Sequence, residues 1–193
     1  MHLLAVSSAA PTTVVSLDEA KAHLRVDYED EDALITALIA AAVDWVEETC
    51  GQDFRTRQWR IERATTFTRL EFPRGPVKSV EAVGLRPDPW EPATIALVLP
   101  ADYRLEEQSR EHPARLIVRE DVWPDLPGED DRAVVVDFTT GWLDVPPAVH
   151  AAHLLHISTL FHAREDQILT TNAMPSQLGI ERLLAMYRIP HYR

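Results

Sequence analysis

A dense run of carboxylates lies in HLRVDYEDEDALI, residues 23–35 of the 193-residue chain. Carboxylates grouped in this way can ligate calcium or serve as a general acid and base. A calcium loop of the EF-hand type needs a glycine at its sixth position and a glutamate at its twelfth. Counted from Asp27, those positions hold Asp32 and Leu38, so the calcium motif is absent. We therefore expect Asp30 or Asp32 to cap a helix, whose positive N-terminal end favours the neighbouring acids.

A second candidate is the histidine stripe HAAHLLH, which places His150, His153 and His156 along one helix. Histidines three residues apart can share a metal, and Glu165 and Asp166 follow them. A metal-dependent hydrolase is therefore the alternative function. A zinc site needs three or four converging ligands, and all three histidines cannot meet one ion from a single helix. The competing interpretation is a polar or interface stripe that gains charge at about pH 6.5.

Signals for other chemistry are weak. The single cysteine, Cys50, has no obvious histidine partner, and neither a GxSxG motif nor a glycine-rich phosphate loop occurs. We predict no catalytic residue, no metal and no cofactor, and hence no enzyme. The formal net charge of −12 disfavours nucleic-acid binding through a basic surface, but it does not exclude a wall past which DNA slides without sticking. No apolar run approaches the ~20 residues of a membrane span, so no membrane partner is expected.

The elements that would position these residues begin and end with helices. Ser16 and Glu19 have the spacing of a capping box, which predicts a helix over residues 17–24. Apolar residues at helical spacing predict a longer helix over about residues 31–49, which Gly51 ends. Helical periodicity returns after Pro147 and again in QLGIERLLAMYR, residues 177–188.

The stretch between the helices has a β pattern. Six short runs rich in Val, Ile, Phe and Trp are separated by Pro and Gly, which predicts a small antiparallel sheet or sandwich. The fold class is therefore α+β, with a helical bundle formed by the N- and C-terminal segments and an inserted small antiparallel β domain. The expected organisation is a flexible N-terminal arm (1–15), a helical body (16–53 and 146–188), the β domain (54–145) and a C-terminal tail (189–193).

The long helix is apolar on two sides. In ALITALIAAAV, residues 33–43, the only polar residue is Thr36, whereas a surface helix should have a charged outer face. Its second face carries Ala37, Ala40 and Ala41. We expect these alanines to lie at close contacts with another element or another subunit.

Several separated phrases resemble the head–tail connector (adaptor) proteins of long-tailed bacteriophages, a family that includes adaptors of phage-like gene transfer agents. Residues 16–54, SLDEAKAHLRVDYEDEDALITALIAAAVDWVEETCGQDF, strongly resemble the opening of such proteins. That opening has a LxxAKxHLRxD phrase, an acidic turn, an aliphatic and alanine-rich helix and a glycine near its end. Further matching phrases follow in order: LEFPRGPVKSVEAV, LPADYRLE, ARLIVRE, VVVDFTTGW and LFHARED. The resemblance covers roughly residues 16–190.

The resemblance implies a structural role. Such adaptors form a ring, usually a dodecamer, beneath the portal protein, extend the DNA channel and dock a neck or tail-completion protein. The helical body would form the ring, which places Ala37, Ala40 and Ala41 at a subunit interface. The C-terminal segment would reach the portal, so the docking residues would be Tyr187, Arg188, Ile189, Pro190, His191, Tyr192 and Arg193.

Two further implications concern DNA and location. DNA would pass through the channel without specific binding. The protein would lie in the neck of a virion or phage-like particle that is assembled in the bacterial cytoplasm. An interaction module with no viral connection is the remaining alternative.

Overall fold

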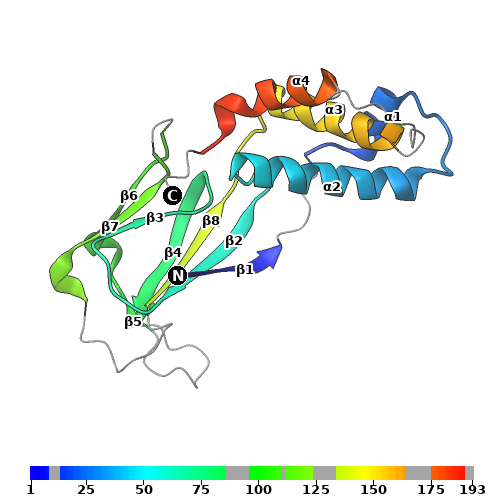
Figure 1. Cartoon of the computed structure of the whole chain (residues 1–193). Coiled ribbons are helices and arrows are strands. Elements are labelled where there is room, and N and C mark those ends of the chain that lie inside the picture. Colours follow the sequence, from blue (N-terminus) through cyan, green and yellow to red (C-terminus); the bar gives the residue numbers. More distant parts are fainter. Residues whose placement is uncertain (9–13, 86–95, 110–111, 124–133, 164–174, 190–193) are drawn as a thin grey trace. The chain divides into compact units, whose positions relative to one another are not determined.

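The structure, a computed structural model, describes residues 1–8, 14–85, 96–109, 112–123, 134–163 and 175–189 (Figure 1). The chain divides into two compact units. The helical unit comprises Thr13–Phe54 and Leu143–Arg188, and the β unit comprises Met1–Thr12, Arg55–Trp142 and Ile189–Arg193. Both units are therefore assembled from segments that lie far apart in the sequence.

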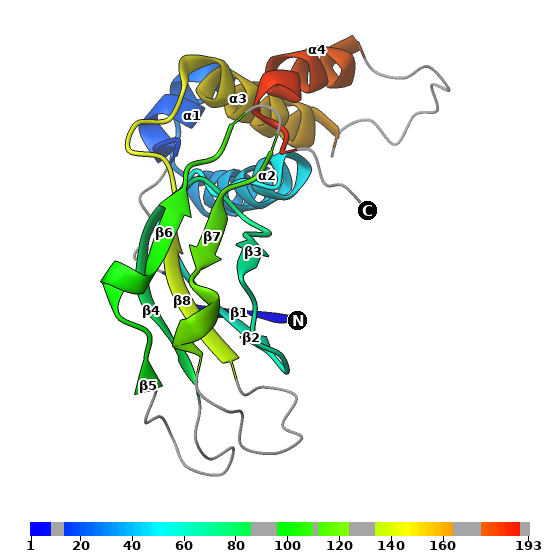
Figure 2. The ribbon, with the colours of Figure 1, turned by 90° about the vertical axis from the view of Figure 1, so that its left-hand side faces the viewer.

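Four helices form the helical unit: α1 (Leu17–Leu24), α2 (Asp32–Cys50), α3 (Pro147–Ala163) and α4 (Pro175–Leu184). A 3-10 turn, Ala185–Tyr187, continues α4. Helix α3 packs against α1, α2 and α4, and it lies between α2 and α4 in two perpendicular views (Figures 1 and 2). The two outer helices thus occupy different sides of α3.

The expected ends of the first two helices are confirmed. The backbone N–H of Glu19 donates to Ser16 Oγ at 3.2 Å, and the backbone N–H of Ser16 donates to Glu19 Oε2 at 2.8 Å. This reciprocal pair is a capping box, which satisfies N–H groups that the first helical turn leaves unpaired. Gly51 ends α2 in the left-handed conformation, with φ of 65°.

The acidic run does not cap α2 in the expected way. The N-cap residue is Glu31, whose side chain makes no capping hydrogen bond. Asp32 is already the first helical residue, and its Oδ1 accepts a hydrogen bond from Lys21 Nζ at 2.5 Å. The Glu31 carboxylate accepts one from the Tyr28 hydroxyl at 3.0 Å. The prediction that Asp30 or Asp32 caps the helix is wrong, because Glu31 occupies the N-cap position and Asp32 pairs with Lys21 of α1 instead.

Two antiparallel sheets form the β unit. One has the order β1–β2–β8–β4–β5 and the other has the order β3–β7–β6. The strands are β1 (His2–Ser8), β2 (Arg57–Arg63), β3 (Arg69–Glu71), β4 (Val77–Leu85), β5 (Ala96–Leu97), β6 (Tyr103–Glu106), β7 (Arg115–Val118) and β8 (Val134–Thr140). The α+β fold class is confirmed, and β2, β3, β4, β5, β7 and β8 each overlap one of the six predicted runs.

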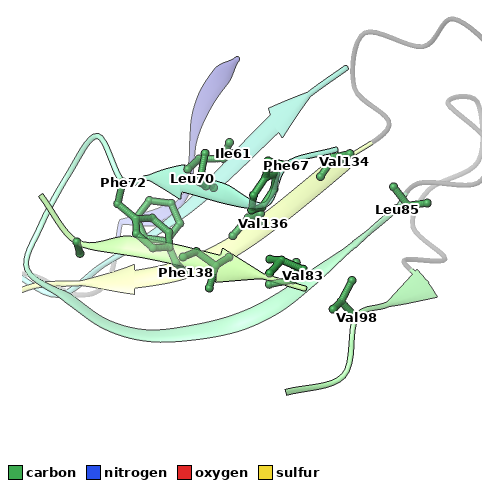
Figure 3. Packing of buried hydrophobic residues seen from close by; sticks show 13 residues of the cluster. Ile61, Phe67, Leu70, Phe72, Val83, Leu85, Val98, Val134, Val136 and Phe138 are labelled. Carbon is green, nitrogen blue, oxygen red and sulfur yellow. The ribbon is translucent and has the colours of Figure 1, made fainter. Parts of the chain in front are cut away.

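A hydrophobic core fills the β unit (Figure 3). Alternate residues of β8, namely Val134, Val136 and Phe138, contribute to it, as a period of two residues requires. The rings of Phe72 and Phe138 lie 4.7 Å apart between centroids. Leu116 of β7 is fully buried in the same core, which brings residues of both sheets together.

The ends of the chain differ from the expected flexible arm and tail. His2–Ser8 form β1, which pairs with β2 and places Leu3 against the core. This stretch has no proline and no Asp, Glu, Lys or Arg, so nothing in it opposes pairing with a strand edge. Ile189, the one described residue of the predicted tail, is only 6% exposed and belongs to the β unit. Residues 9–13 and 190–193 lie outside the described part of the chain.

Candidate functional site

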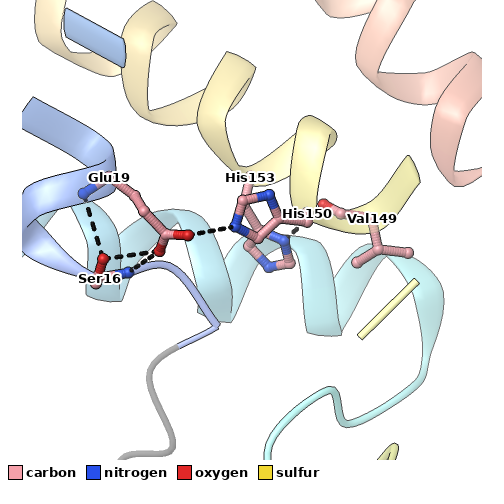
Figure 4. Close-up of polar contacts among 5 residues, drawn as sticks. All are labelled: Ser16, Glu19, Val149, His150 and His153. Carbon is pink, nitrogen blue, oxygen red and sulfur yellow. Dashed lines mark hydrogen bonds and ion pairs between the residues drawn. The ribbon is translucent and has the colours of Figure 1, made fainter. Parts of the chain in front are cut away.

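Helix α3 places the three histidines of the stripe in different surroundings. His150 Nε2 lies 3.6 Å from Glu19 Oε1, the carboxylate of the α1 capping box (Figure 4). His153 is completely buried. His156 stacks on Trp45 of α2 with ring centroids 4.3 Å apart. The three imidazoles therefore do not converge on one point.

His153 acts as a core residue of the helical unit. Its Nδ1 lies 2.7 Å from the carbonyl oxygen of Val149, which only accepts, so Nδ1 carries the proton (Figure 4). Burial lowers the pKa of His153 to about 4, because the charged ring would lose its hydration. The ring of Phe54 meets it edge-on, with centroids 6.0 Å apart. His153 is thus neutral at neutral pH and lies in the core beside the ring of Phe54.

The described residues offer no metal site. Within them, no group of three His, Cys, Asp or Glu side chains is placed to hold an ion. Glu165 and Asp166, the partners considered for a hydrolase, lie outside the described ranges. Cys50 is buried, and burial raises the pKa of its thiol to about 11, which disfavours the nucleophilic thiolate. Among the helices that the structure describes, none is long and apolar enough to cross a membrane.

The surface of α2 that points away from the core is the first candidate interface. Ile35, Ile39 and Val46 are buried on the inner side of this helix. The opposite side, here called the α2 outer face, is exposed and consists of Ala33, Leu34, Thr36, Ala37, Ala40, Ala41, Asp44 and Glu48. The sequence-predicted alanines thus share one exposed face, apolar apart from Thr36 over its first turns and acidic near its C-terminal end. Their role in a subunit contact stays a prediction.

A second apolar face lies on the C-terminal helix. Ile180 and Leu184 are buried on the inner side of α4. Its exposed side, here called the α4 outer face, consists of Leu178, Glu181, Arg182, Ala185 and Met186. Leu178 is 54% exposed and Met186 is 67% exposed. The sequence analysis did not predict this face. Leu178, Arg182 and Met186 recur every four residues, between the buried Ile180 and Leu184, and this spacing could have indicated it.

The predicted portal-docking segment is only partly described. The backbone carbonyl of Tyr187 accepts a hydrogen bond from the Gln52 side chain, which ties the end of the helical unit to the end of α2. Arg188 is exposed, whereas Ile189 is buried. Pro190, His191, Tyr192 and Arg193 lie outside the described residues, so docking by this segment stays a prediction.

A model of a known protein family matches part of the chain. Residues 14–83 match the family of phage gp6-like head–tail connector proteins. The resemblance to connectors seen in the sequence is thereby confirmed. No curated protein matches the chain in sequence.

Solved structures with a similar fold come from gene transfer agent (GTA) particles. A chain of the neck of an empty GTA particle, computed with C6 symmetry, has a TM-score of 0.77 and 22% identity. A chain of a native GTA virion has a TM-score of 0.75 and 24% identity. A chain of the native GTA neck, computed with C12 symmetry, has a TM-score of 0.73 and 21% identity. Each match covers 100% of this chain and 98% of the other.

Proposed function

We propose that this protein is a structural head–tail connector that forms a ring in the neck of a phage or a gene transfer agent particle. The observation that carries the proposal is the fold match over the whole chain to GTA neck chains, joined to the connector-family match over residues 14–83. The matched necks were computed with C6 and C12 symmetry, which supports a cyclic assembly of this chain. The ring extends the DNA channel beneath the portal protein and offers a surface to a neck or tail-completion protein.

The distribution of charge supports a conduit role. The helical unit holds 15 of the 31 acidic residues but only 5 of the 19 Lys and Arg residues, a formal charge of −10. An acidic surface repels phosphates at long range, so DNA passes it without being held. This charge argues against a DNA-binding function for the same unit.

The proposed contacts follow the exposed residues. Ala37, Ala40 and Ala41 serve the subunit contact, because an exposed apolar helix face is stable when a neighbour covers it. The segment from Tyr187 to Arg193 reaches the portal, with exposed Arg188 at its described end.

Electron microscopy of the purified chain mixed with portal complexes tests this function. We expect a ring on the portal or a free ring with cyclic symmetry. A mixture that shows neither a ring nor a portal-bound layer at any concentration would overturn the proposal. Because rings can require the portal as a template, a monomer in the absence of portal does not count against it.

A further inference from the structure

The helical unit exposes two different apolar helix faces. The α2 outer face and the α4 outer face belong to helices that pack on different sides of α3 (Figures 1 and 2). A ring of identical subunits needs two different, complementary surfaces on each copy, because each copy contacts its two neighbours through unlike faces. The arrangement of α2 and α4 around α3 meets that requirement within one unit.

The two faces also complement one another in size and, at Arg182, in charge. Alanines on the α2 outer face allow a helix to approach closely, and the larger Leu178 and Met186 project from the α4 outer face. Arg182 lies between these two residues in the sequence, four positions from each. Asp44 and Glu48, at the C-terminal part of the α2 outer face, carry the charge opposite to that of Arg182 and the same charge as its neighbour Glu181, so the electrostatic attraction depends on Arg182 facing these acids.

We propose that the ring contact forms between the α2 outer face of one copy and the α4 outer face of the next. The occupant of each face is thus a second copy of this chain. When Arg182 lies opposite Asp44, one of its two apolar neighbours on α4 lies about 6 Å away along the helix, over Ala40 or Ala41. This holds for either direction of the α4 helix relative to α2. The inference rests on the proposed ring-forming function and names the surfaces that the ring uses.

Cysteine cross-linking on assembled rings tests the contact. In a Cys50→Ala background, Ala40→Cys and Met186→Cys are combined in one chain. The protein is mixed with portal complexes, treated with a short bismaleimide and separated under denaturing conditions. A head-to-tail contact joins residue 40 of each copy to residue 186 of the next. We therefore expect a ladder of covalent multimers that ends at the size of the ring.

Three control chains define the alternatives. A chain with Ala40→Cys alone and a chain with Met186→Cys alone should give no multimer, and strong dimer formation by either would indicate a symmetric two-fold contact and overturn the proposal. A chain that combines Met186→Cys with Ala22→Cys, an exposed alanine of α1 outside both faces, should give no ladder. A ladder from this chain equal to that of the test chain would show non-specific cross-linking and remove the support.

Microscopy of the same samples separates the two proposals. Rings without a ladder both from the test chain and from a matching chain that combines Ala40→Cys with Leu178→Cys, which tests the other direction of α4, would overturn the α2–α4 contact and leave the connector function intact. The absence of rings from the wild-type mixture would overturn the function itself, and the contact with it.

Charge reversal gives a second, independent measurement. Arg182→Glu should weaken the apparent affinity between subunits by about tenfold, because it places acids opposite Asp44 and Glu48. Adding Asp44→Arg to the same chain should restore most of the loss. An Arg182→Glu chain that forms rings at the wild-type concentration would contradict the predicted pairing.

Discussion

The two units of this protein bury their hydrophobic residues to different extents. The β unit encloses its own core with residues from two sheets and has a formal charge of −2. The helical unit has a formal charge of −10 and yet leaves the apolar outer faces of α2 and α4 exposed. A unit so acidic gains solubility from its charge while it keeps apolar faces open for contact. The comparison contrasts a β unit that closes its core within one copy with a helical unit whose exposed apolar faces the proposed ring contact would cover.

The largest expected effect tests the self-sufficiency of the β unit. Phe138→Ala should lower the free energy of unfolding by about 3–5 kcal/mol, since it opens a cavity beside Phe72 in a closed core. Urea unfolding followed by circular dichroism measures the change. A loss below about 1 kcal/mol would show that the β unit depends on surfaces outside its own core.

The helical unit should respond to acid through His153. Its folded-state pKa of about 4 lies below the ordinary value of 6.5, so the unfolded chain binds the proton first as pH falls. The contribution of His153 to the free energy of unfolding is therefore fully present above pH 6.5. It falls as the pH drops from 6.5 to about 4, by about 3 kcal/mol at most. Burial also lowers the pKa of His156, which adds in the same direction, and the charge of Glu47 opposes the shift of His153.

Urea titrations at several pH values, followed by circular dichroism, measure this dependence. His153→Leu should flatten the slope between pH 6.5 and 4, whereas His23→Asn, at an exposed position of α1, should leave it unchanged. An unchanged slope in His153→Leu would mean that other groups control the acid response.

A smaller effect is expected at the start of the helical unit. Ser16→Ala removes the hydroxyl that accepts the Glu19 N–H, and should cost about 1 kcal/mol of unfolding free energy. Because hydrogen bonds from Ser16 lower the pKa of Glu19, the variant should also raise that pKa toward 4.5. Thermal unfolding and NMR titration of the carboxyl group measure the two effects, and Thr36→Ala, at an exposed site of α2, provides a control.

The smallest effect on stability is expected on the α2 outer face. Ala40→Glu should change the unfolding free energy by less than about 0.5 kcal/mol, because the side chain is exposed in a single copy. The same variant should prevent ring formation on the portal, while Ala22→Glu on α1 should permit it. Melting curves and electron microscopy measure the two properties. Normal rings from Ala40→Glu would show that this face stays exposed in the particle.

Local sequence signals predicted much of this fold. The capping box of Ser16 and Glu19, the stop at Gly51 and the periodicity of α2 depend on neighbours within a few residues, so they can be read from the sequence. The strand β1 was missed because its partner, β2, lies about 50 residues away and supplies the hydrogen bonds that define it. The pairing of Asp32 with Lys21 was missed for a similar reason, since it depends on how α1 and α2 pack.

The candidate site was predicted less completely than the fold. The helical pattern of α2 showed that Ala37, Ala40 and Ala41 lie on a face that its own core does not bury. These residues are exposed in the structure. Which side of α4 is buried depends on its packing against α3, so the exposure of Leu178 and Met186 required the structure. His150, His153 and His156 are evenly spaced along α3, yet each lies in a different environment. Helical spacing alone could not predict that difference.

The discontinuity of the helical unit has a consequence for the timing of synthesis. α2 ends at Cys50 and α3 begins at Pro147. The side of α2 that α3 covers therefore has no partner until the whole β insertion has been translated. At common rates of translation this interval lasts about 5 to 20 seconds. The α4 outer face is completed only at Met186, later still. A ribosome that stops early therefore releases a chain with α2 but without α4, and such a chain would lack one of the two surfaces of the proposed ring contact.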